Sequence, residues 1–181
     1  MSYQLETIRI RHTNQTHFQP AWALYENTFP EEERRELDLQ KEIMKNPYYH
    51  FDIVRIDGVL VGFILWWQFE GMRYIEHLAT KPEYRGKGYG KNIIEHFSSE
   101  CEDFIILEVE MPSNTINKRR IVFYERLKFK LNAHFYEQLP MQKNGVSVQL
   151  KLMSYPDELS DAKLLAFKEN FRNMCFTPYL E

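Results

Sequence analysis

The sequence predicts an α+β fold with a mixed sheet, and three observations support that prediction. Stretches in which polar and apolar residues alternate, as in strands, occur in both halves of the chain. Stretches with helical spacing of apolar residues are interspersed among them. Hydrophobic residues make up 44% and charged residues 27% of the 181 residues, as in globular proteins. With no internal repeat or linker, we expect one domain over residues 1–181.

The first half of the chain is expected to form a strand, two helices and three further strands. Apolar and aromatic residues at helical spacing predict a helix over about 16–27. A second helix is expected to begin at Pro30, whose fixed φ suits a first turn, and to end at Asn46-Pro47. Asp57-Gly58 is a strong hairpin turn signal between two β-rich segments. The predicted strands here are 7–11, 48–56, 59–70 and 74–80.

The second half alternates helices and strands and ends in a hairpin and a helix. A glycine-rich loop precedes a helix that carries Ile93, Ile94 and Phe97. Asn144-Gly145 lies in the turn of the final hairpin, and Ser160 is suited to cap the terminal helix. The other predicted elements are the strands 104–110, 130–139 and 146–153 and a helix over 117–127.

Composition excludes several classes of function. The net charge of −3 argues against a nucleic-acid-binding protein. The longest apolar run, Val59 to Trp67, is too short to span a membrane, and the start of the sequence does not resemble a signal peptide. Cys101 and Cys175 are far apart, and the histidines lack metal-ligand spacing. We therefore expect a cytoplasmic protein without a metal.

The loop from Arg85 to Gly90 is a candidate phosphate site. It joins a strand to a helix, and glycines followed by the unpaired amides of a helix N-terminus favour anions. The spacing does not fit a Walker A loop, because Arg85 and Asn92 occupy positions that need Gly and Ser or Thr. A dinucleotide fingerprint fails as well, since Lys91 stands in place of its third glycine.

The pattern that fits is Arg85-x-x-Gly88-x-Gly90. It resembles the acetyl-coenzyme A signature of the GCN5-related N-acetyltransferase (GNAT) family. A second match to that family is Asn117, which precedes Tyr124 by seven residues, followed by a Leu-Lys-Phe segment ending at Phe129. The order of the predicted elements is also similar to that of the family. The resemblance implies a mixed, mostly antiparallel sheet of about seven strands flanked by helices, here with an additional C-terminal helix.

The resemblance also implies where acetyl-CoA binds. Backbone groups at the end of a strand would bind the pantetheine arm, the amides of the glycine loop would bind the pyrophosphate, and Asn117 would hydrogen-bond the pantetheine. The residues implied are Leu78, Ala79, Thr80, Arg85, Gly86, Lys87, Gly88, Tyr89, Gly90, Lys91 and Asn117. The chain departs from the family pattern at Lys128, where a glycine is usual, and at Arg120, where a small residue is common.

Acetyl transfer to an amine requires a base for the amine and a proton donor for the leaving thiolate. By family position Tyr124 is the expected acid, since a phenol is a reasonable donor to a thiolate. Glu76, nine residues before Arg85, is the expected base, with Glu108, Glu110 or a water as alternatives. Strand alternation predicts that His77 points away from Glu76.

The resemblance implies an N-acetyltransferase acting on a primary amine of a small molecule or peptide. A non-catalytic acyl-CoA sensor with the same fold is the alternative, and the oligomeric state is left open, a homodimer included. Acidic residues on the second predicted helix favour a cationic acceptor. They are Glu31, Glu32, Glu33, Glu36, Asp38 and Glu42, against Arg34, Arg35 and Lys41. Trp22, Tyr25, Tyr48 and Tyr49 are aromatic candidates for the same region.

Overall fold

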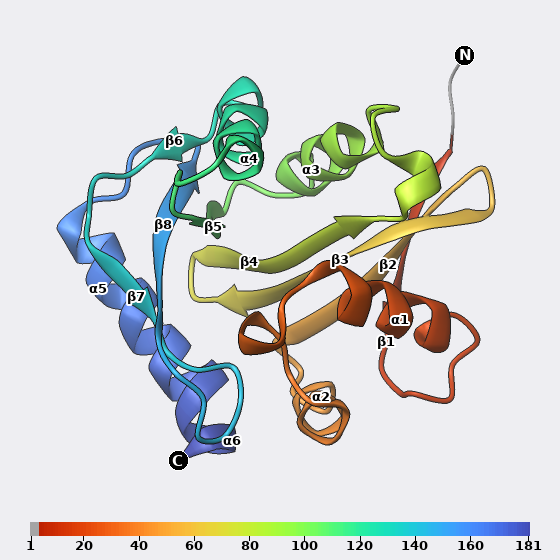
Figure 1. The fold of residues 1–181 in the computed structure, drawn as a ribbon, viewed down its shortest axis with the longest axis horizontal. Coiled ribbons are helices and arrows are strands. Elements are labelled where there is room, and N and C mark those ends of the chain that lie inside the picture. Colours follow the sequence, from red (N-terminus) through yellow and green to blue (C-terminus); the bar gives the residue numbers. More distant parts are fainter. Residues whose placement is uncertain (1–3) are drawn as a thin grey trace. The chain divides into compact units, whose positions relative to one another are not determined.

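The computed structural model describes residues 4–181 and has the predicted α+β fold, with mostly antiparallel strands (Figure 1). The strands are β1 (Leu5–Ile10), β2 (Tyr49–Ile56), β3 (Val59–Phe69), β4 (Met72–Thr80), β5 (Phe104–Glu110), β6 (Lys130–Leu131), β7 (Tyr136–Gln138) and β8 (Val148–Tyr155). The α-helices are α1 (Phe18–Thr28), α2 (Leu37–Ile43), α3 (Tyr89–Ser99), α4 (Thr115–Arg126), α5 (Asp161–Asn170) and α6 (Thr177–Leu180). Short helical turns are η1 (Glu31–Glu33), η2 (Pro82–Tyr84) and the π-helical η3 (Phe171–Phe176).

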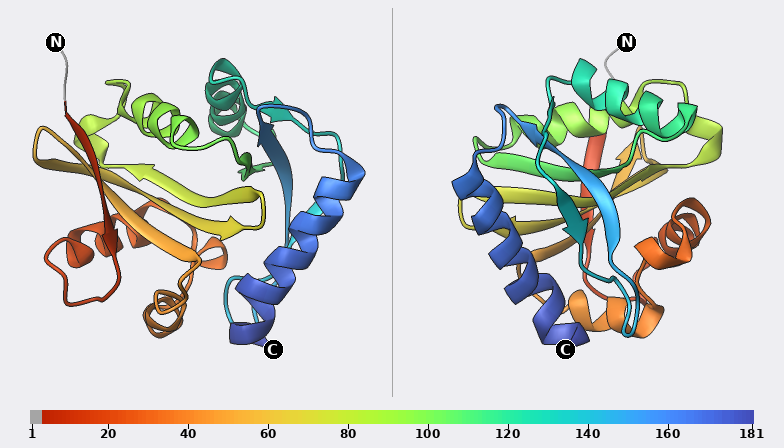
Figure 2. Two further views of the ribbon diagram at one scale, coloured as in Figure 1. Left: turned by 180° about the vertical axis from the view of Figure 1, so that it is seen from behind. Right: turned by 60° about the vertical axis from the view of Figure 1, so that its left-hand side comes forward.

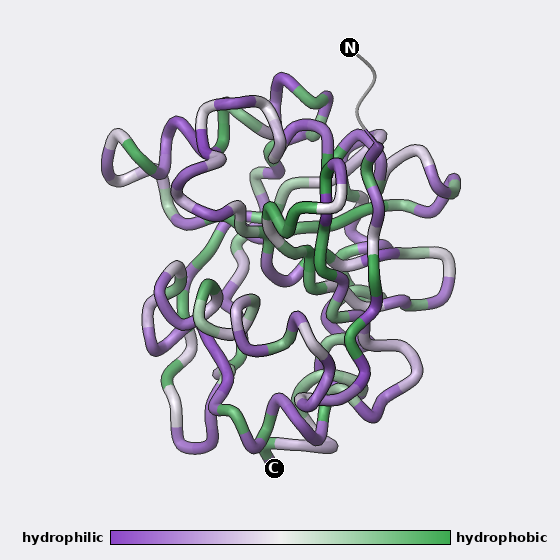
Figure 3. Tube along the Cα trace, turned by 90° about the vertical axis from the view of Figure 1, so that its right-hand side faces the viewer, coloured by the Kyte–Doolittle hydropathy of each residue, from purple (hydrophilic) through white to green (hydrophobic). Residues whose placement is uncertain are grey.

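The chain divides into two compact units. The first comprises the chain up to Gln68 together with Ile75–Glu102, and the second comprises Phe69–Tyr74 together with Asp103–Glu181. Buried apolar residues occur in both units. In the hydropathy-coloured trace, hydrophobic segments lie mostly in the interior and hydrophilic ones in the outer loops (Figure 3).

In the first unit, β1, β2 and β3 are neighbours and pair antiparallel. The predicted hairpin is confirmed, and its turn residues Asp57 and Gly58 have positive φ values of 49° and 81°. Helix α1 packs on one face of the strands, where the Phe18 ring lies 5.7 Å from that of Phe51. Helix α3 packs on the other face, where Phe97 lies 5.2 Å from Trp66. Both faces of these strands are therefore covered, which explains why β3 reads as an almost unbroken apolar run.

The helix predicted from Pro30 to Asn46 is shorter than expected. The chain forms the single turn η1, passes through extended backbone at Arg34 and Glu36, and becomes helical only from Leu37 to Ile43. Arg35 lies in this extended stretch and its side chain is buried. Burial of a charged side chain needs a partner, so a tertiary contact described below overrides the local helical preference.

The second unit is built around β8. Strands β5, β6 and β7 all pair antiparallel with it, so the strand predicted over 130–139 is divided into two short segments. The predicted cap of the terminal helix is confirmed, because the Ser160 hydroxyl accepts a hydrogen bond from the Lys163 amide at 3.3 Å. Helix α5 runs beside β7 and β8 (Figure 2) and buries Phe167 completely.

Candidate functional site

The glycine loop has the backbone geometry of an anion site. Gly86 and Gly88 have φ values of 73° and 83°, and Gly88 is the N-cap of α3. The first intrahelical hydrogen bond runs from the Asn92 amide to the Gly88 carbonyl at 3.1 Å, so the preceding amides of the helix have no intrahelical acceptor. A Cβ atom at either glycine would meet nothing within 4 Å. The loop therefore has open space beside its glycines, which lets an anion approach the backbone.

Cationic side chains flank this loop and help to fix it. The Arg85 side chain donates from Nε to the Thr80 carbonyl at 3.2 Å, which ties the loop to the end of β4. The Lys87 ammonium lies 5.5 Å from the centre of the Tyr84 ring, and Lys91 forms an ion pair with Glu95 at 3.7 Å. The arrangement supplies positive charge beside the open amides without burying any of it.

The end of β4 packs very closely on β3. A Cβ atom on Gly62 would collide with the carbonyl oxygen of Ala79, so only glycine fits at that position. The Lys81 amide donates to the Val61 carbonyl at 2.8 Å. The backbone at Leu78, Ala79 and Thr80, expected to bind the pantetheine arm, is thereby held in a fixed position at the start of the loop.

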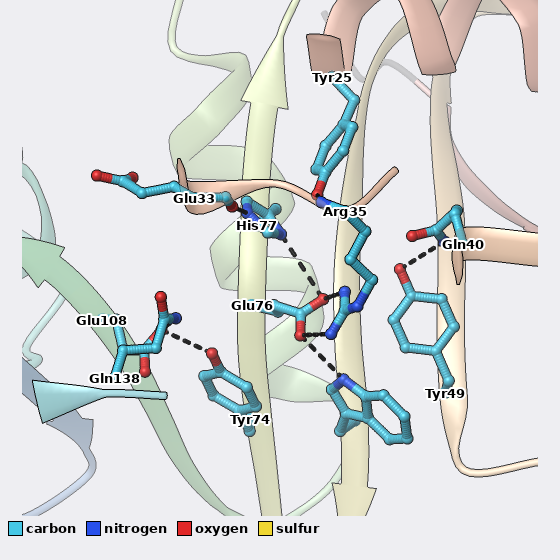
Figure 4. A network of polar contacts seen from close by, with 11 residues as sticks. Tyr25, Glu33, Arg35, Gln40, Tyr49, Tyr74, Glu76, His77, Glu108 and Gln138 are labelled. Atoms are coloured by element: carbon cyan, nitrogen blue, oxygen red, sulfur yellow. Dashed lines mark hydrogen bonds and ion pairs between the residues drawn. The ribbon is translucent and has the colours of Figure 1, made fainter. Parts of the chain in front are cut away.

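Glu76 lies in a buried ion pair with Arg35. The guanidinium group contacts both carboxylate oxygens, and the two side chains are 0% and 2% exposed. The Trp67 indole donates to the same carboxylate at 3.2 Å (Figure 4). Burial alone would raise the pKa of the Glu76 carboxyl, but the charge and hydrogen bonds of Arg35 outweigh burial and lower it to about 2. A carboxylate in this state accepts a proton poorly, which disfavours Glu76 as the base.

The expectation for His77 was wrong. Its Nδ1 lies 3.7 Å from the Glu76 carboxylate, and its Nε2 lies 2.8 Å from the Glu33 carbonyl oxygen (Figure 4). Alternation along a strand fixes only the direction of each Cβ, and the long Glu76 side chain brings its carboxylate back toward the imidazole. Together with Arg35, His77 therefore ties the segment after α1 to β4.

In the second unit, Glu108 on β5 accepts three hydrogen bonds from neutral donors. The Tyr74 hydroxyl donates to Oε2 at 2.6 Å, and Gln138 donates to the same oxygen (Figure 4). The Tyr136 hydroxyl donates to Oε1. These donors come from β4 and β7 and are distant from Glu108 in the sequence. Sequence reasoning missed all three, because no spacing rule connects them.

Helix α4 carries the other expected site residues. Asn114 caps the helix by accepting a hydrogen bond from the Asn117 amide at 2.9 Å, and the Asn117 side chain donates to the Met111 carbonyl at 3.0 Å. Arg120 forms an ion pair with Glu110. Of the two alternative bases on β5, Glu110 therefore has a cationic partner, whereas the donors to Glu108 named above are uncharged.

Tyr124 lies in the last turn of α4 and is 8% exposed. The Phe129 amide donates to the Tyr124 carbonyl at 3.1 Å and the Lys128 amide to the Glu125 carbonyl at 2.9 Å, which together form a Schellman motif. The Phe129 ring packs against the Tyr124 ring at 5.7 Å. Burial raises the pKa of the Tyr124 phenol to about 12, against the opposing charge of Arg120. The phenol is therefore held in place and stays protonated at physiological pH.

The acidic side chains of residues 31–42 are mostly exposed, whereas one of the cations among them, Arg35, is buried. Arg35 points inward to Glu76, so it does not offset the acidic side chains outside. Of the four aromatic candidates, Trp22, Tyr25 and Tyr49 are buried in the core, whereas Tyr48 is 54% exposed. Tyr48 is the aromatic residue of this set that remains accessible to a cationic ligand.

Residues 4–181 contain no cluster of three or more His, Cys, Asp or Glu side chains suited to a metal ion. Within the same residues, no helix has the length and apolar character needed to cross a membrane.

Three comparisons with known proteins agree with one another. A sequence model of the acetyltransferase (GNAT) family matches residues 14–129. A Bacillus subtilis (strain 168) protein assigned as a ribosomal protein bS18-alanine N-acetyltransferase is 32% identical over 124 residues, 68% of this chain and 72% of that protein. The structure of a Bacteroides thetaiotaomicron protein assigned to the GNAT acetyltransferases matches with a TM-score of 0.85 at 31% identity, covering 95% of this chain and 99% of that one. The Escherichia coli ribosomal-protein-S18-alanine N-acetyltransferase shares the fold, with a TM-score of 0.60 at 19% identity over 88% of this chain and 96% of that one.

Proposed function

Because the chain belongs to the acetyltransferase (GNAT) family, we propose that it transfers an acetyl group from acetyl-CoA to a primary amine of a small molecule or peptide. The family match over residues 14–129 includes the glycine loop, Asn117 and Tyr124. The single observation that supports the chemistry most directly is the environment of Glu108 on β5, whose carboxylate accepts hydrogen bonds from Tyr74, Tyr136 and Gln138.

Binding of acetyl-CoA follows the family pattern. The open amides of residues 86–91 and the dipole of α3 would bind the pyrophosphate, with Arg85, Lys87 and Lys91 contributing positive charge. The backbone of Leu78, Ala79 and Thr80 and the Asn117 side chain would bind the pantetheine. The positive φ values of Gly86 and Gly88, and the open space beside them, fit this role.

For the base we propose Glu108 in place of Glu76. A base must present its carboxylate to a neutral or protonated amine, and a guanidinium group already contacts the carboxylates of Glu76 and Glu110. The phenols of Tyr74 and Tyr136 and the amide of Gln138 donate to both oxygens of Glu108 and so orient its carboxylate. We propose a structural role for the Glu76–Arg35 pair, which fixes the segment between α1 and α2.

The proposed reaction is a direct attack. The amine nitrogen forms a bond to the thioester carbonyl carbon, and the carbon–sulfur bond breaks. The proton lost by the nitrogen passes to Glu108, directly or through a water molecule. The leaving thiolate accepts a hydrogen bond from the Tyr124 phenol and takes its proton from solvent after release. With a pKa of about 12, the Tyr124 phenol is suited to stabilising the developing thiolate by hydrogen bonding.

The acceptor we propose is a cationic amine, with a peptide N-terminus as the first candidate. The exposed acidic side chains of η1 and α2 outnumber the nearby cations and attract positive charge. Asp38 and Glu42 pair with Lys41 and Lys45, whereas the buried Arg35 guanidinium does not offset the exposed acids. The Bacillus subtilis relative is assigned to an alanine of a ribosomal protein, which supports a peptide amine.

A panel of amines tests this proposal. Thiol release from acetyl-CoA and the mass of the product would be measured with an alanine-ended peptide, a polyamine and an anionic amino sugar phosphate. We expect acetylation of the cationic acceptors, with kcat/KM falling as salt rises, and a loss of about 10²-fold or more in Glu108→Gln. The same peptide with a blocked N-terminus is the matched control. A preference for the anionic amine, or full activity in Glu108→Gln, would contradict the proposal.

A further inference from the structure

The terminal helix α5 lies outside residues 14–129, the part of the chain that matches the family model. Its one fully buried side chain is Phe167, which is 0% exposed. Phe171, the next apolar residue on the same side, begins the π-helical turn and is 3% exposed. The helix therefore uses few residues to pack on the second unit, and Phe167 is the central one.

Phe167 contacts both phenols that bind Glu108. Its ring lies 5.1 Å from that of Tyr74, edge to face at 66°, and 5.8 Å from that of Tyr136. The Tyr74 and Tyr136 hydroxyls donate to different oxygens of the same carboxylate. A single benzyl group thus packs against both tyrosines that orient Glu108.

Packing of this kind fixes the direction of a phenol hydroxyl. Only two torsions move a tyrosine ring, so a well-packed neighbour restricts where its hydroxyl points. Hydrogen bonds to a carboxylate favour its ionised form and hold its orientation. Small displacements of a catalytic group are costly, because a shift of about 1 Å can reduce a rate by about 10²-fold.

We propose that Phe167 is a positioning residue for the acetyl-transfer site: it holds Tyr74 and Tyr136 so that they orient the Glu108 carboxylate. The inference rests on the proposed role of Glu108 as the base. Helix α5 would thereby contribute to the reaction indirectly, since the donors to Glu108 named above lie on β4 and β7. Two titratable groups that face Glu108 are the phenols of Tyr74 and Tyr136, and Glu110, two residues along β5, is paired with Arg120.

The variant Phe167→Leu tests the proposal, because leucine keeps the site apolar but cannot pack against both phenols. We expect the acidic limb of the pH profile of kcat/KM to move to higher pH by about half a unit to one unit, the effect of a weakened hydrogen bond. The plateau value of kcat should fall about tenfold, with KM for acetyl-CoA unchanged. Tyr74→Phe and Tyr136→Phe, which retain the rings and lose the hydroxyls, should each move the limb in the same direction.

Phe104→Leu is the matched control. Phe104 is also buried in the second unit, at 6% exposed, and its ring contacts the Lys163 ammonium at 3.8 Å. The Phe104→Leu variant should have a lower melting temperature, as Phe167→Leu does, but the acidic limb of its pH profile should lie at the same pH as in the parent. Rates are compared at a temperature where near-ultraviolet circular dichroism shows each variant folded.

The outcomes separate this inference from the proposed function. An unmoved acidic limb in Phe167→Leu, with Glu108→Gln inactive, would overturn the positioning role alone. If the acidic limb of the pH profile moves equally in Phe104→Leu, the shift reflects general destabilisation, and this result would also overturn the positioning role of Phe167. Full activity in Glu108→Gln would instead overturn the assignment of the base.

Discussion

The environment of Tyr124 decides which role its phenol is suited to in the proposed reaction. Its ring is packed by Phe129, and its backbone carbonyl is part of the motif that ends α4. Burial raises the pKa of its phenol to about 12, so that the hydroxyl is protonated at every pH at which an acetyltransferase works. Complete proton transfer to a thiolate is then uphill, because a thiol has a pKa of about 8.5. The phenol is better suited to stabilising negative charge as it develops on sulfur.

Replacement of Tyr124 by phenylalanine tests this role. Tyr124→Phe removes the hydroxyl and keeps the ring that packs on Phe129, so we expect unchanged stability and unchanged affinity for acetyl-CoA. The single-turnover rate of acetyl transfer should fall by about 10²-fold. Phe123→Leu, on the same helix, is the control for altered packing. A parent-like single-turnover rate in Tyr124→Phe would exclude the phenol from the chemical step.

At the same scale, the choice among three glutamates could not be made from the sequence. Glu76, Glu108 and Glu110 all lie on predicted strands near the expected site, and each is a plausible base by position. The three carboxylates differ in their hydrogen-bond and ion-pair partners, and these partners are distant in the sequence. Arg35 is 41 residues from Glu76, and Tyr74 is 34 residues from Glu108. Which residues meet a carboxylate depends on how strands and loops pack, and periodicity does not carry that information.

At the scale of elements, the end of α4 contains an unfavourable residue. The Schellman motif needs a left-handed residue after the helix, normally glycine, and here Lys128 adopts it with φ of 69°. This is one of the two positions at which the chain departs from the family pattern. The backbone keeps the geometry that glycine would favour, so the substitution stores strain without changing the motif.

Lys128→Gly should therefore stabilise the protein. We expect the free energy of unfolding to rise by roughly 0.5–1 kcal/mol, because glycine adopts this φ without steric cost. Lys130→Gly, at an exposed strand position two residues later, should lower stability instead. Denaturant unfolding of the two variants and the parent measures both effects. A loss of stability in Lys128→Gly would mean that the Lys128 side chain makes a contact worth more than the strain.

The glycine loop offers a second prediction at this scale, with a control of matched geometry. Gly88 and Gly71 both have positive φ, of 83° and 65°, and a Cβ at either would meet nothing within 4 Å. Alanine should therefore cost a similar amount of stability at both positions. At Gly88, but not at Gly71, the new methyl group would lie at the N-terminus of α3, beside the expected coenzyme site.

Gly88→Ala should weaken binding of acetyl-CoA by about tenfold or more, equivalent to one lost hydrogen bond to a charged group, whereas Gly71→Ala should bind like the parent. Calorimetric titration measures both affinities. Equal affinities in the two variants would show that the coenzyme does not approach this loop.

The elements themselves were largely predictable where local signals agree. The Asp57-Gly58 hairpin, the capped helix after Ser160 and the loop into α3 follow from turn and cap chemistry. The segment after Pro30 has three consecutive glutamates suited to a helix start, yet it becomes extended around Arg35. The buried ion pair with Glu76 decides that conformation, and neither local propensity nor charge patterning indicates it.

For the whole molecule, the Glu76–Arg35 pair is expected to govern stability in acid. In the folded chain the pKa of the Glu76 carboxyl is lowered to about 2, mainly because the Arg35 charge outweighs burial, whereas its ordinary value is 4.5. A carboxyl whose pKa is lowered by folding stabilises the native state above its ordinary pKa. That contribution is lost progressively as the pH falls from about 4.5 toward 2. The shift corresponds to about 3 kcal/mol.

Glu76→Gln tests this contribution through the pH dependence of unfolding. At pH 7 we expect the variant to be less stable than the parent by about 3 kcal/mol, because Arg35 is left buried without a counter-charge. The difference should shrink as the pH falls from about 4.5 toward 2, because in this range the carboxyl of the unfolded parent is protonated while that of the folded parent is still ionised. Denaturant unfolding at a series of pH values measures the gap, and Glu102→Gln, at an exposed position, should track the parent throughout. A gap between parent and Glu76→Gln that stays constant from pH 7 to the lowest pH would mean that the ion pair does not set acid stability, and that Glu76 ionises as an ordinary carboxyl despite its contact with Arg35.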